Sequence, residues 1–179
     1  DKSYSDISFK KNRPDYERFS DAKRRIKSFP QFYLGKDICD LGCGEGLFLK
    51  GVQLLANSVC GVELQDDCVS TLNRSKIPCK RKLSEYDGNF DVIFMFHSLE
   101  HFEDPIRMLQ DAKSKLKRGG KVVIEVPHAN DFLLTKFPQK KFKNFTLWSQ
   151  HLVLHTRQSL ERILAHVGFE NSYVFGVQR

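Results

Sequence analysis

The feature that most constrains this chain is a glycine-rich turn between a short apolar run and a helical pattern. Residues 40–46 read D-L-G-C-G-E-G and directly follow the apolar run that starts at residue 37. Glycine permits a tight turn and lets a ligand approach the backbone closely. The helix expected after the turn offers free N–H groups to a carboxylate. The segment therefore predicts a ligand site at the end of a first strand.

Short apolar runs alternate with helical patterns along most of the chain. Strands are expected at 37–41, 58–64, 77–82, 90–96, 121–126 and 171–177, with a turn at Gly119 and Gly120. Helices are expected between them, at 45–55, 66–73, 104–116 and 157–166. This alternation predicts an α/β fold with a doubly wound, mostly parallel sheet and helices on both faces. In such sheets ligands bind beyond the carboxyl ends of the strands, where the strand order reverses.

The length of 179 residues predicts one main domain. We expect a basic lead-in and a helix, opened by Pro14, within residues 1–35, and the main domain at 36–179. Residues 129–150 are rich in phenylalanine and lysine and contain the single tryptophan, Trp148. They interrupt the alternation, which predicts a lid-like insertion.

Net charge and cysteine content limit which partners, metals and disulfides are expected for this chain. The net charge of +7 suits an anionic partner, such as a phosphorylated substrate or nucleic acid, and equally a solvated surface. The five cysteines include no C-x-x-C pair, so we expect neither a metal site nor a disulfide. The chain shows no membrane span and no signal peptide, which predicts a reduced, cytoplasmic protein.

Glycine spacing separates two classes of nucleotide site. Dinucleotide sites read G-x-G-x-x-G, whereas here the glycines stand at 42, 44 and 46 and Leu47 takes the third glycine's place. Asp40 would repel a pyrophosphate but suits a cofactor with a cationic amino group. Glu63 ends the next expected strand, where a carboxylate can accept both hydroxyls of a ribose. A dehydrogenase is therefore disfavoured.

The pattern D-x-G-x-G-x-G, followed by an acid that ends the second strand, resembles class I S-adenosylmethionine-dependent methyltransferases. Residues 90–101 and 116–127 look like that family's fourth and fifth strands. Residues 151–156 and 167–170 are similar to the tail of a branch that methylates small metabolites and sugars. The resemblance covers about residues 36–177 and implies a Rossmann-like sheet. Such sheets end in an antiparallel hairpin, whose last strand would fall after Arg179, so we expect either a truncated chain or an unusually built sheet edge.

The resemblance also implies the residues that bind the cofactor, S-adenosyl-L-methionine. Those around the methionine moiety would be Asp40, Gly42, Cys43, Gly44 and Gly46. Glu63 would bind the ribose, Leu64 and Leu83 would meet the adenine, and the backbone of Phe96 and His97 would line the methyl group. The family usually places an acid directly before the residue at Leu83. Here that residue is Lys82, and Glu85 is the alternative contact.

Methyl transfer is an in-line displacement that depends mainly on alignment, helped by a general base when the acceptor is a hydroxyl or a carbon acid. His128 and His151 are the predicted catalytic residues, as base or substrate contacts, because they follow the fifth strand or flank the insertion. Glu100 is a further candidate for such a role, although capping of the following turn is the favoured interpretation, and His101 is expected to orient the loop by hydrogen bonding.

The predicted function is methylation of a small polar metabolite, such as a sugar or nucleotide-linked sugar. One alternative is an RNA methyltransferase, favoured by the basic charge. Residues 96–99, F-H-S-L, lack the N/D-P-P-[YFW] tetrapeptide of many base-amino methyltransferases. Another alternative is a non-catalytic module that only binds the cofactor. The methylated atom and the oligomeric state are left open.

Overall fold

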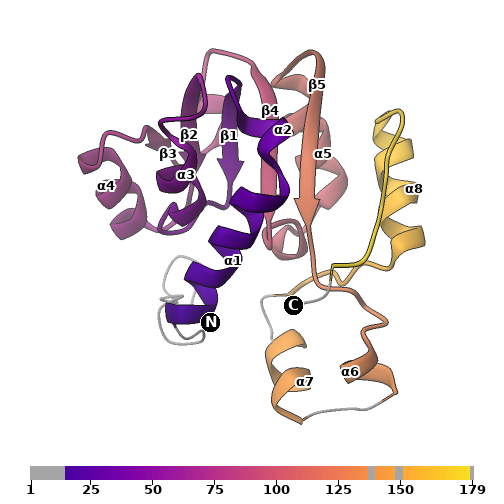
Figure 1. Cartoon of the computed structure of the whole chain (residues 1–179). Coiled ribbons are helices and arrows are strands. Elements are labelled where there is room, and N and C mark those ends of the chain that lie inside the picture. The colour runs from indigo at the N-terminus through magenta and orange to yellow at the C-terminus, as the bar shows by residue number, and fades with distance from the viewer. Residues whose placement is uncertain (1–14, 137–139, 148–150, 178–179) are drawn as a thin grey trace. The chain divides into compact units, whose positions relative to one another are not determined.

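The structure is a computed structural model that describes residues 15–136, 140–147 and 151–177 of the chain (Figure 1). It comprises two compact units. The first contains the described residues up to Phe96 together with Ala112–Ile124, and the second contains His97–Asp111 and the described residues from Glu125 onward. Trp148 and Phe137 of the expected insertion, and most of the basic lead-in, lie outside the described residues. The predicted boundary between 1–35 and 36–179 stays a prediction.

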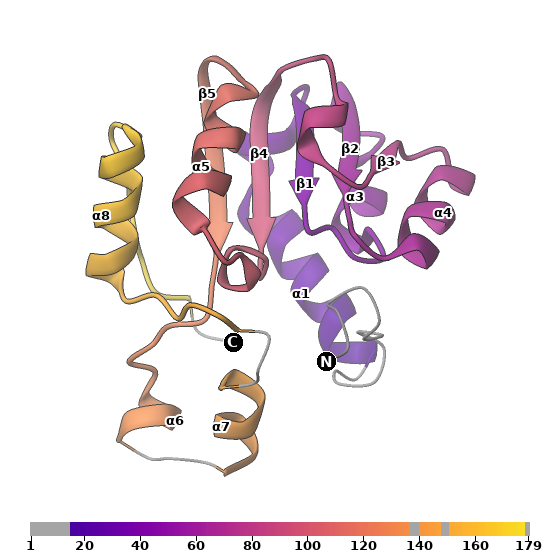
Figure 2. The ribbon, with the colours of Figure 1, turned by 180° about the vertical axis from the view of Figure 1, so that it is seen from behind.

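Five strands form one sheet in the order β3-β2-β1-β4-β5 (Figure 2). Their bounds are β1 (Asp37–Leu41), β2 (Ser58–Val62), β3 (Cys79–Lys80), β4 (Phe90–Phe96) and β5 (Leu116–Glu125). β1 pairs in parallel with both β2 and β4, and β2 pairs in parallel with β3. The chain order reverses at β1, so the carboxyl ends of β1 and β4 mark the place where ligands bind in such sheets. The predicted fold class is confirmed.

Helices connect the strands, as the alternating pattern predicts. Their bounds are α1 (Asp15–Ser28), α2 (Pro30–Tyr33), α3 (Leu47–Val52), α4 (Asp66–Arg74), η3 (Leu83–Glu85), η4 (Leu99–His101), α5 (Pro105–Ser114), α6 (Phe132–Thr135), α7 (Lys140–Thr146) and α8 (Arg157–Val167). Pro30 opens α2, because a first-turn proline lacks only an N–H that would be unsatisfied anyway. No helix in the described part of the chain has both the length and the apolar character of a membrane span.

An aromatic cluster holds α3 against β4. The ring of Phe48 lies 4.8 Å from that of Phe94 and 5.1 Å from that of Phe96, centroid to centroid. All three side chains are buried, and burying a side chain of this size stabilises the fold by about 1.5–3 kcal/mol. Because α3 begins directly after the glycine-rich turn, this packing also fixes where the turn lies.

Helix α1 packs on α3. A Cβ atom at Gly51 would come within 2.3 Å of the Ile26 side chain, so the two helices approach closely at this glycine. Arg18 forms a 2.9 Å ion pair with Glu45 of the glycine-rich turn. At least one positive charge of the basic helix α1, that of Arg18, is therefore paired within the first unit.

Two local expectations are wrong. The expected turn at Gly119 and Gly120 lies inside β5, which begins at Leu116, and Gly119 takes a left-handed φ of 76° within the strand. Residues 171–177, expected as a strand, form none. Tyr173, Phe175 and Val177 are exposed, Tyr173 at 87%, so the alternation there has no core to face in the described residues.

Gly46→Ala tests the close approach of the glycine-rich turn to α4. We expect a loss of more than about 2 kcal/mol in the free energy of unfolding, measured by urea titration, because two effects add. Gly46 has a φ of 68°, and a Cβ there would lie 2.3 Å from Cδ2 of the fully buried Leu72. Gly35→Ala is the matched control: its φ is 61° but nothing lies within 4 Å. Equal losses in both variants would contradict a steric role for Leu72.

Candidate functional site

The glycine-rich turn leaves β1 in a conformation that other residues rarely adopt. Gly42, Gly44 and Gly46 have φ values of 82°, 53° and 68°, all left-handed, where an L-residue pays about 1–2 kcal/mol. The N–H groups of Gly42 and Cys43 donate to the Val62 carbonyl at 2.8 and 3.2 Å, which ties the turn to the end of β2. The backbone alone therefore explains why glycine recurs at alternate positions.

The turn has one packed side and one open side. Gly46 is buried against Leu72, whereas a Cβ at Gly44 would meet no atom within 4 Å. An open glycine in a turn lets another molecule approach its backbone. The geometry therefore allows a ligand to lie against the turn at Gly44.

Asp40 is the most unusual charge in the first unit. It lies on β1 beside Gly61 of β2 and Phe94 of β4, and its side chain is only 3% exposed. Its Oδ1 atom is buried and accepts no hydrogen bond from any described residue. The pKa of Asp40 is raised to about 7, chiefly by burial and also by the nearby Glu63, while the positive charge of Arg25 opposes the rise. A buried carboxylate without a donor is costly, and such groups mark functional sites.

Glu63 follows β2 and is almost as buried as Asp40, at 4% exposure. Its carboxylate accepts hydrogen bonds from three backbone N–H groups, those of Gly44 at 2.8 Å, Leu64 at 2.7 Å and Gln65 at 3.0 Å. These bonds hold the glycine-rich turn and the end of β2 together. Two carboxylate oxygens have about four acceptor positions, so capacity remains for a hydroxyl, and the ribose role stays a prediction.

The residues expected around an adenine differ in exposure. Leu64 is 40% exposed directly beside Glu63, which leaves an apolar side chain available for a ring. Leu83 is buried in η3, and both Lys82 and Glu85 are exposed, so no described contact favours Glu85 as the substitute acid. Cys43 is half buried, with its Sγ 3.9 Å from Sγ of Cys79.

Phe96 has its side chain in the core, and the Arg25 guanidinium lies over its ring, 4.5 Å from the centroid. The Phe96 side chain is therefore part of the core, and the role of its backbone beside the methyl group stays a prediction. Arg25 is also the cation whose field favours ionised Asp40.

The first unit thus brings Asp40, the three glycines and Glu63 together, at the end of β1 where the strand order reverses. Two buried carboxylates and an open glycine fit a ligand with an ammonium group and a diol better than a diphosphate. The fold and this arrangement define an α/β domain that binds a cationic nucleoside cofactor.

The comparison with known families agrees. A model of the methyltransferase domain family matches residues 12–174, and the chain belongs to this family. The class I S-adenosylmethionine-dependent fold predicted from the sequence is confirmed, and S-adenosylmethionine is the cofactor that this assignment supports.

Curated relatives match over about half of this chain. A tRNA U34 carboxymethyltransferase of Nautilia profundicola is 31% identical over 101 residues, which cover 50% of this chain and 34% of that protein. A ubiquinone biosynthesis O-methyltransferase of Paraburkholderia phymatum is 26% identical over 107 residues, covering 54% and 46%. The chain therefore spans between about a third and a half of the length of these relatives.

Solved structures show the same fold. A SAM-dependent methyltransferase from Archaeoglobus fulgidus superposes with a TM-score of 0.65 at 24% identity, covering 86% of this chain and 70% of that one. A plantazolicin methyltransferase in complex with SAH gives a TM-score of 0.60 at 19% identity, covering 88% and 71%.

The second unit contains His97, which was expected to line the cofactor through its backbone. His97 has a φ of 54°, rare for a residue with a side chain. Its N–H donates to the Glu125 carbonyl at 2.7 Å. Its ring nitrogens lie 3.2 Å from Glu100 Oε1 and 3.0 Å from Glu125 Oε1. Two carboxylates thus hold the ring, which explains how the strained backbone persists.

The two histidines predicted to be catalytic also belong to the second unit, and different contacts hold them. His128 is exposed and forms a parallel β-bridge with His155. His151 is half buried, with Nδ1 2.7 Å from the Thr146 carbonyl. His155, which the sequence analysis did not select, is 3% exposed, and burial lowers its pKa. Both catalytic assignments stay predictions.

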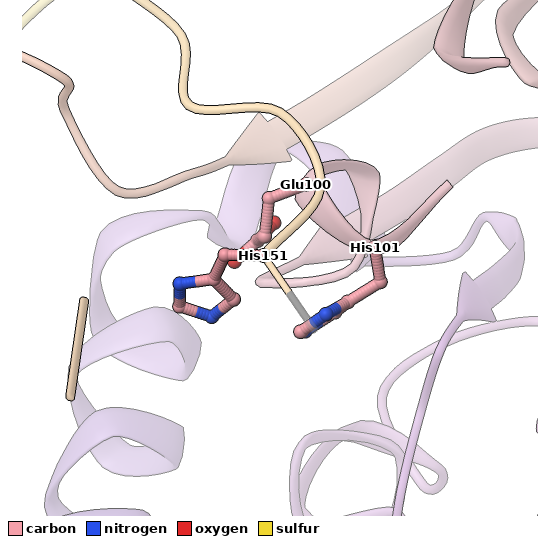
Figure 3. A group of neighbouring side chains, drawn as sticks. All are labelled: Glu100, His101 and His151. Carbon is pink, nitrogen blue, oxygen red and sulfur yellow. The ribbon is translucent and has the colours of Figure 1, made fainter. Parts of the chain in front are cut away.

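One group of neighbouring side chains was not predicted from the sequence. Glu100 and His101 of η4 meet His151, although 50 positions separate the two histidines (Figure 3). Glu100 is fully buried. The adjacent acid and histidine that follow β4, Glu100 and His101, were the sequence signal for such a group. Spacing alone could not show that His151, so distant in sequence, lies beside them.

Asp40→Asn tests whether the buried carboxylate opposes folding. Folded Asp40 keeps its proton up to about pH 7, whereas the unfolded chain releases it near about pH 3.9, so stability falls as pH rises between these values. We expect the unliganded variant to be more stable than the wild type at about pH 8, by up to about 4 kcal/mol, and the gain to shrink towards about pH 4.

Urea unfolding across that pH range measures the effect. Asp37→Asn is the control of opposite sign, because hydrogen bonds from Lys117, Ser58 and Asn57 lower the pKa of Asp37 to about 2. Its ionised form is stabilised in the folded state, so this variant loses stability at neutral pH. A destabilised Asp40→Asn protein at high pH would contradict the account.

Cofactor affinity should follow the ionisation of Asp40. Only the carboxylate form pairs with an ammonium group, so the affinity for S-adenosylhomocysteine should fall about tenfold per pH unit below about pH 7. Isothermal titration calorimetry of the wild type measures this slope. Asp40→Asn should bind weakly at every pH, and an affinity independent of pH in the wild type would refute the assigned role.

Proposed function

We propose that the protein transfers the methyl group of S-adenosylmethionine to an oxygen atom of a small polar metabolite, with a sugar or nucleotide-linked sugar as the preferred class. The observation that carries this proposal is buried Asp40, whose Oδ1 lacks a donor among the described residues, next to the glycine-rich turn. When bound, the cofactor supplies an electrophilic methyl group on a sulfonium centre.

The chain's own contribution begins with alignment. Asp40 would hold the ammonium end, and Glu63 the ribose, from the ends of neighbouring strands. Because the backbone N–H of Gly44 donates to Glu63 at 2.8 Å, the two contacts belong to one connected framework. Fixing both ends restricts the methyl group to one direction, and alignment of this kind supplies a large part of the rate in an in-line displacement.

The second requirement is removal of a proton from the acceptor. His128 and His151 are the proposed groups, as base or substrate contacts, since an imidazole titrates near neutral pH. A loss of turnover with unchanged cofactor affinity in His128→Ala or His151→Ala would support a role in catalysis, and wild-type rates in both would remove histidine from the scheme.

The curated relatives support an oxygen acceptor without naming it for this chain. The O-methyltransferase of ubiquinone biosynthesis acts, by its name, on oxygen. RNA methylation is the second candidate, favoured by the net charge of +7 and by the relative that acts on tRNA. Within α1, however, Arg18 and Arg24 are paired with Glu45 and Asp21, which reduces the charge available for RNA.

The two candidates separate in one experiment. Full-length protein is incubated with methyl-labelled S-adenosylmethionine and a cell extract split into a small-molecule and an RNA fraction. We expect label in the small-molecule fraction, unchanged by ribonuclease and absent with Asp40→Asn. Label in the RNA fraction that disappears after ribonuclease, with a strong salt dependence, would establish the second candidate instead. Cofactor binding without label in either fraction would indicate a non-catalytic module.

A further inference from the structure

Three potential metal ligands meet in the second unit, and none of them is one of the two carboxylates that the proposed function uses. One ligand atom each from Glu100, His101 and His151 lies within 4.8 Å of the others (Figure 3). The imidazole rings of His101 and His151 have centroids 5.0 Å apart. The ligands of one Zn²⁺ ion, each about 2.1 Å from it, lie at most about 4.2 Å apart, so small rotations of the rings would complete the set.

The surroundings orient two of these side chains, His151 and Glu100, as metal sites require. His151 Nδ1 lies 2.7 Å from the carbonyl of buried Thr146, so Nδ1 carries the proton and Nε2 is the nitrogen suited to coordinate a metal ion. A bond of this kind fixes the tautomer of metal-bound histidines. Glu100 is fully buried, and Oε1 lies 3.2 Å from His97 Nδ1. The carboxylate is therefore held in place by a second residue.

The backbone joins the two segments that supply the ligands. The carbonyl of Glu100 accepts hydrogen bonds from the N–H groups of Leu152, at 2.8 Å, and Val153, at 3.2 Å. η4 is thus bonded directly to the residues after His151. The two backbone segments are joined before any ion binds, which lowers the ordering cost of binding.

We propose that Glu100, His101 and His151 bind a divalent first-row transition metal ion such as Zn²⁺. Two imidazoles and one carboxylate favour such ions over Mg²⁺ and Ca²⁺, which prefer oxygen ligands. Three protein ligands leave a coordination position open, as in catalytic rather than structural zinc sites. This site departs from the prediction of no metal, which considered cysteine spacing and interleaved histidines within short segments.

The catalytic role that we infer for this metal site rests on the proposed function. A hydroxyl oxygen of the acceptor would take the open position, where the ion lowers its pKa so that its proton passes to a general base or to water. The oxygen would then form the new bond to the methyl group as the bond to sulfur breaks, and S-adenosylhomocysteine would leave. His151 would then act as a ligand, which leaves His128 as the histidine proposed as the base.

Zn²⁺ binding is tested directly, with metal-depleted full-length protein and no cofactor. We expect about one equivalent to bind in a calorimetric titration and to raise the melting temperature, while Mg²⁺ at the same concentration does neither. Titration with Co²⁺ should give the visible absorption bands of a nitrogen-coordinated site. Absence of Zn²⁺ binding by the wild type would overturn the proposal.

Variants separate a built site from adventitious binding to surface histidines. His101→Ala and His151→Ala should each weaken Zn²⁺ binding more than about tenfold. His166→Ala, which removes an exposed histidine of α8, should leave it unchanged. Circular dichroism of each variant verifies folding. The third ligand is tested with Glu100→Gln, because glutamine keeps the shape of the buried side chain where a smaller residue would unfold the loop. Equal affinity in His166→Ala and the His101→Ala/His151→Ala double variant would mean an adventitious ion only and would refute the site.

The outcome is independent of the proposed function. S-adenosylhomocysteine binding is measured in the same variants and should be unchanged, because Asp40 and Glu63 are intact. Zn²⁺ binding without methyl transfer would contradict the proposed function and leave the site standing. Methyl transfer without Zn²⁺ binding would contradict the site alone.

Discussion

The buried carboxylate of Asp40 is the constraint on which the first unit depends. Nothing in the hydrophobic core favours an acid at 3% exposure whose Oδ1 accepts no bond from the described residues. The fold tolerates it because the surrounding strands are otherwise apolar and well packed, and because Arg25 opposes the effect of burial on its pKa. A cationic ligand group would reverse this penalty, so the free energy stored in the unliganded protein becomes binding free energy. Stability and cofactor affinity are therefore coupled through one side chain.

The glycine-rich turn serves the same arrangement. Left-handed backbone at alternate residues carries the chain from β1 into α3 while its N–H groups bond to Val62 and Glu63. These bonds place the two acids on one framework, and the cluster of Phe48, Phe94 and Phe96 prevents α3 from moving away. The core thus positions the site. In the second unit, carboxylates and histidines contact one another around η4. These ionisable side chains are separate from the residues proposed to bind the cofactor.

Much of the first unit could be predicted from the sequence, because its signals are local. The turn at 40–46, the apolar strands and Glu63 at a strand end each depend on neighbouring residues. The second unit could not be predicted in the same way. Glu100 and His151 meet only through the tertiary structure, and His97 adopts its φ of 54° because Glu100 and Glu125 hold its ring. The strand expected at 171–177 does not form, because a local pattern was not enough there. An alternating pattern indicates a strand only when a partner strand and a core are present.

The most direct test of the account is a carbon-13 NMR titration of the Asp40 carboxyl, assigned by comparison with Asp40→Asn, in the presence and absence of S-adenosylhomocysteine. The account predicts a pKa of about 7 in the free protein and, in the complex, a pKa below the ordinary aspartate value of about 3.9, because the bound ammonium group stabilises the carboxylate. An Asp40 pKa that the ligand leaves unchanged would contradict it.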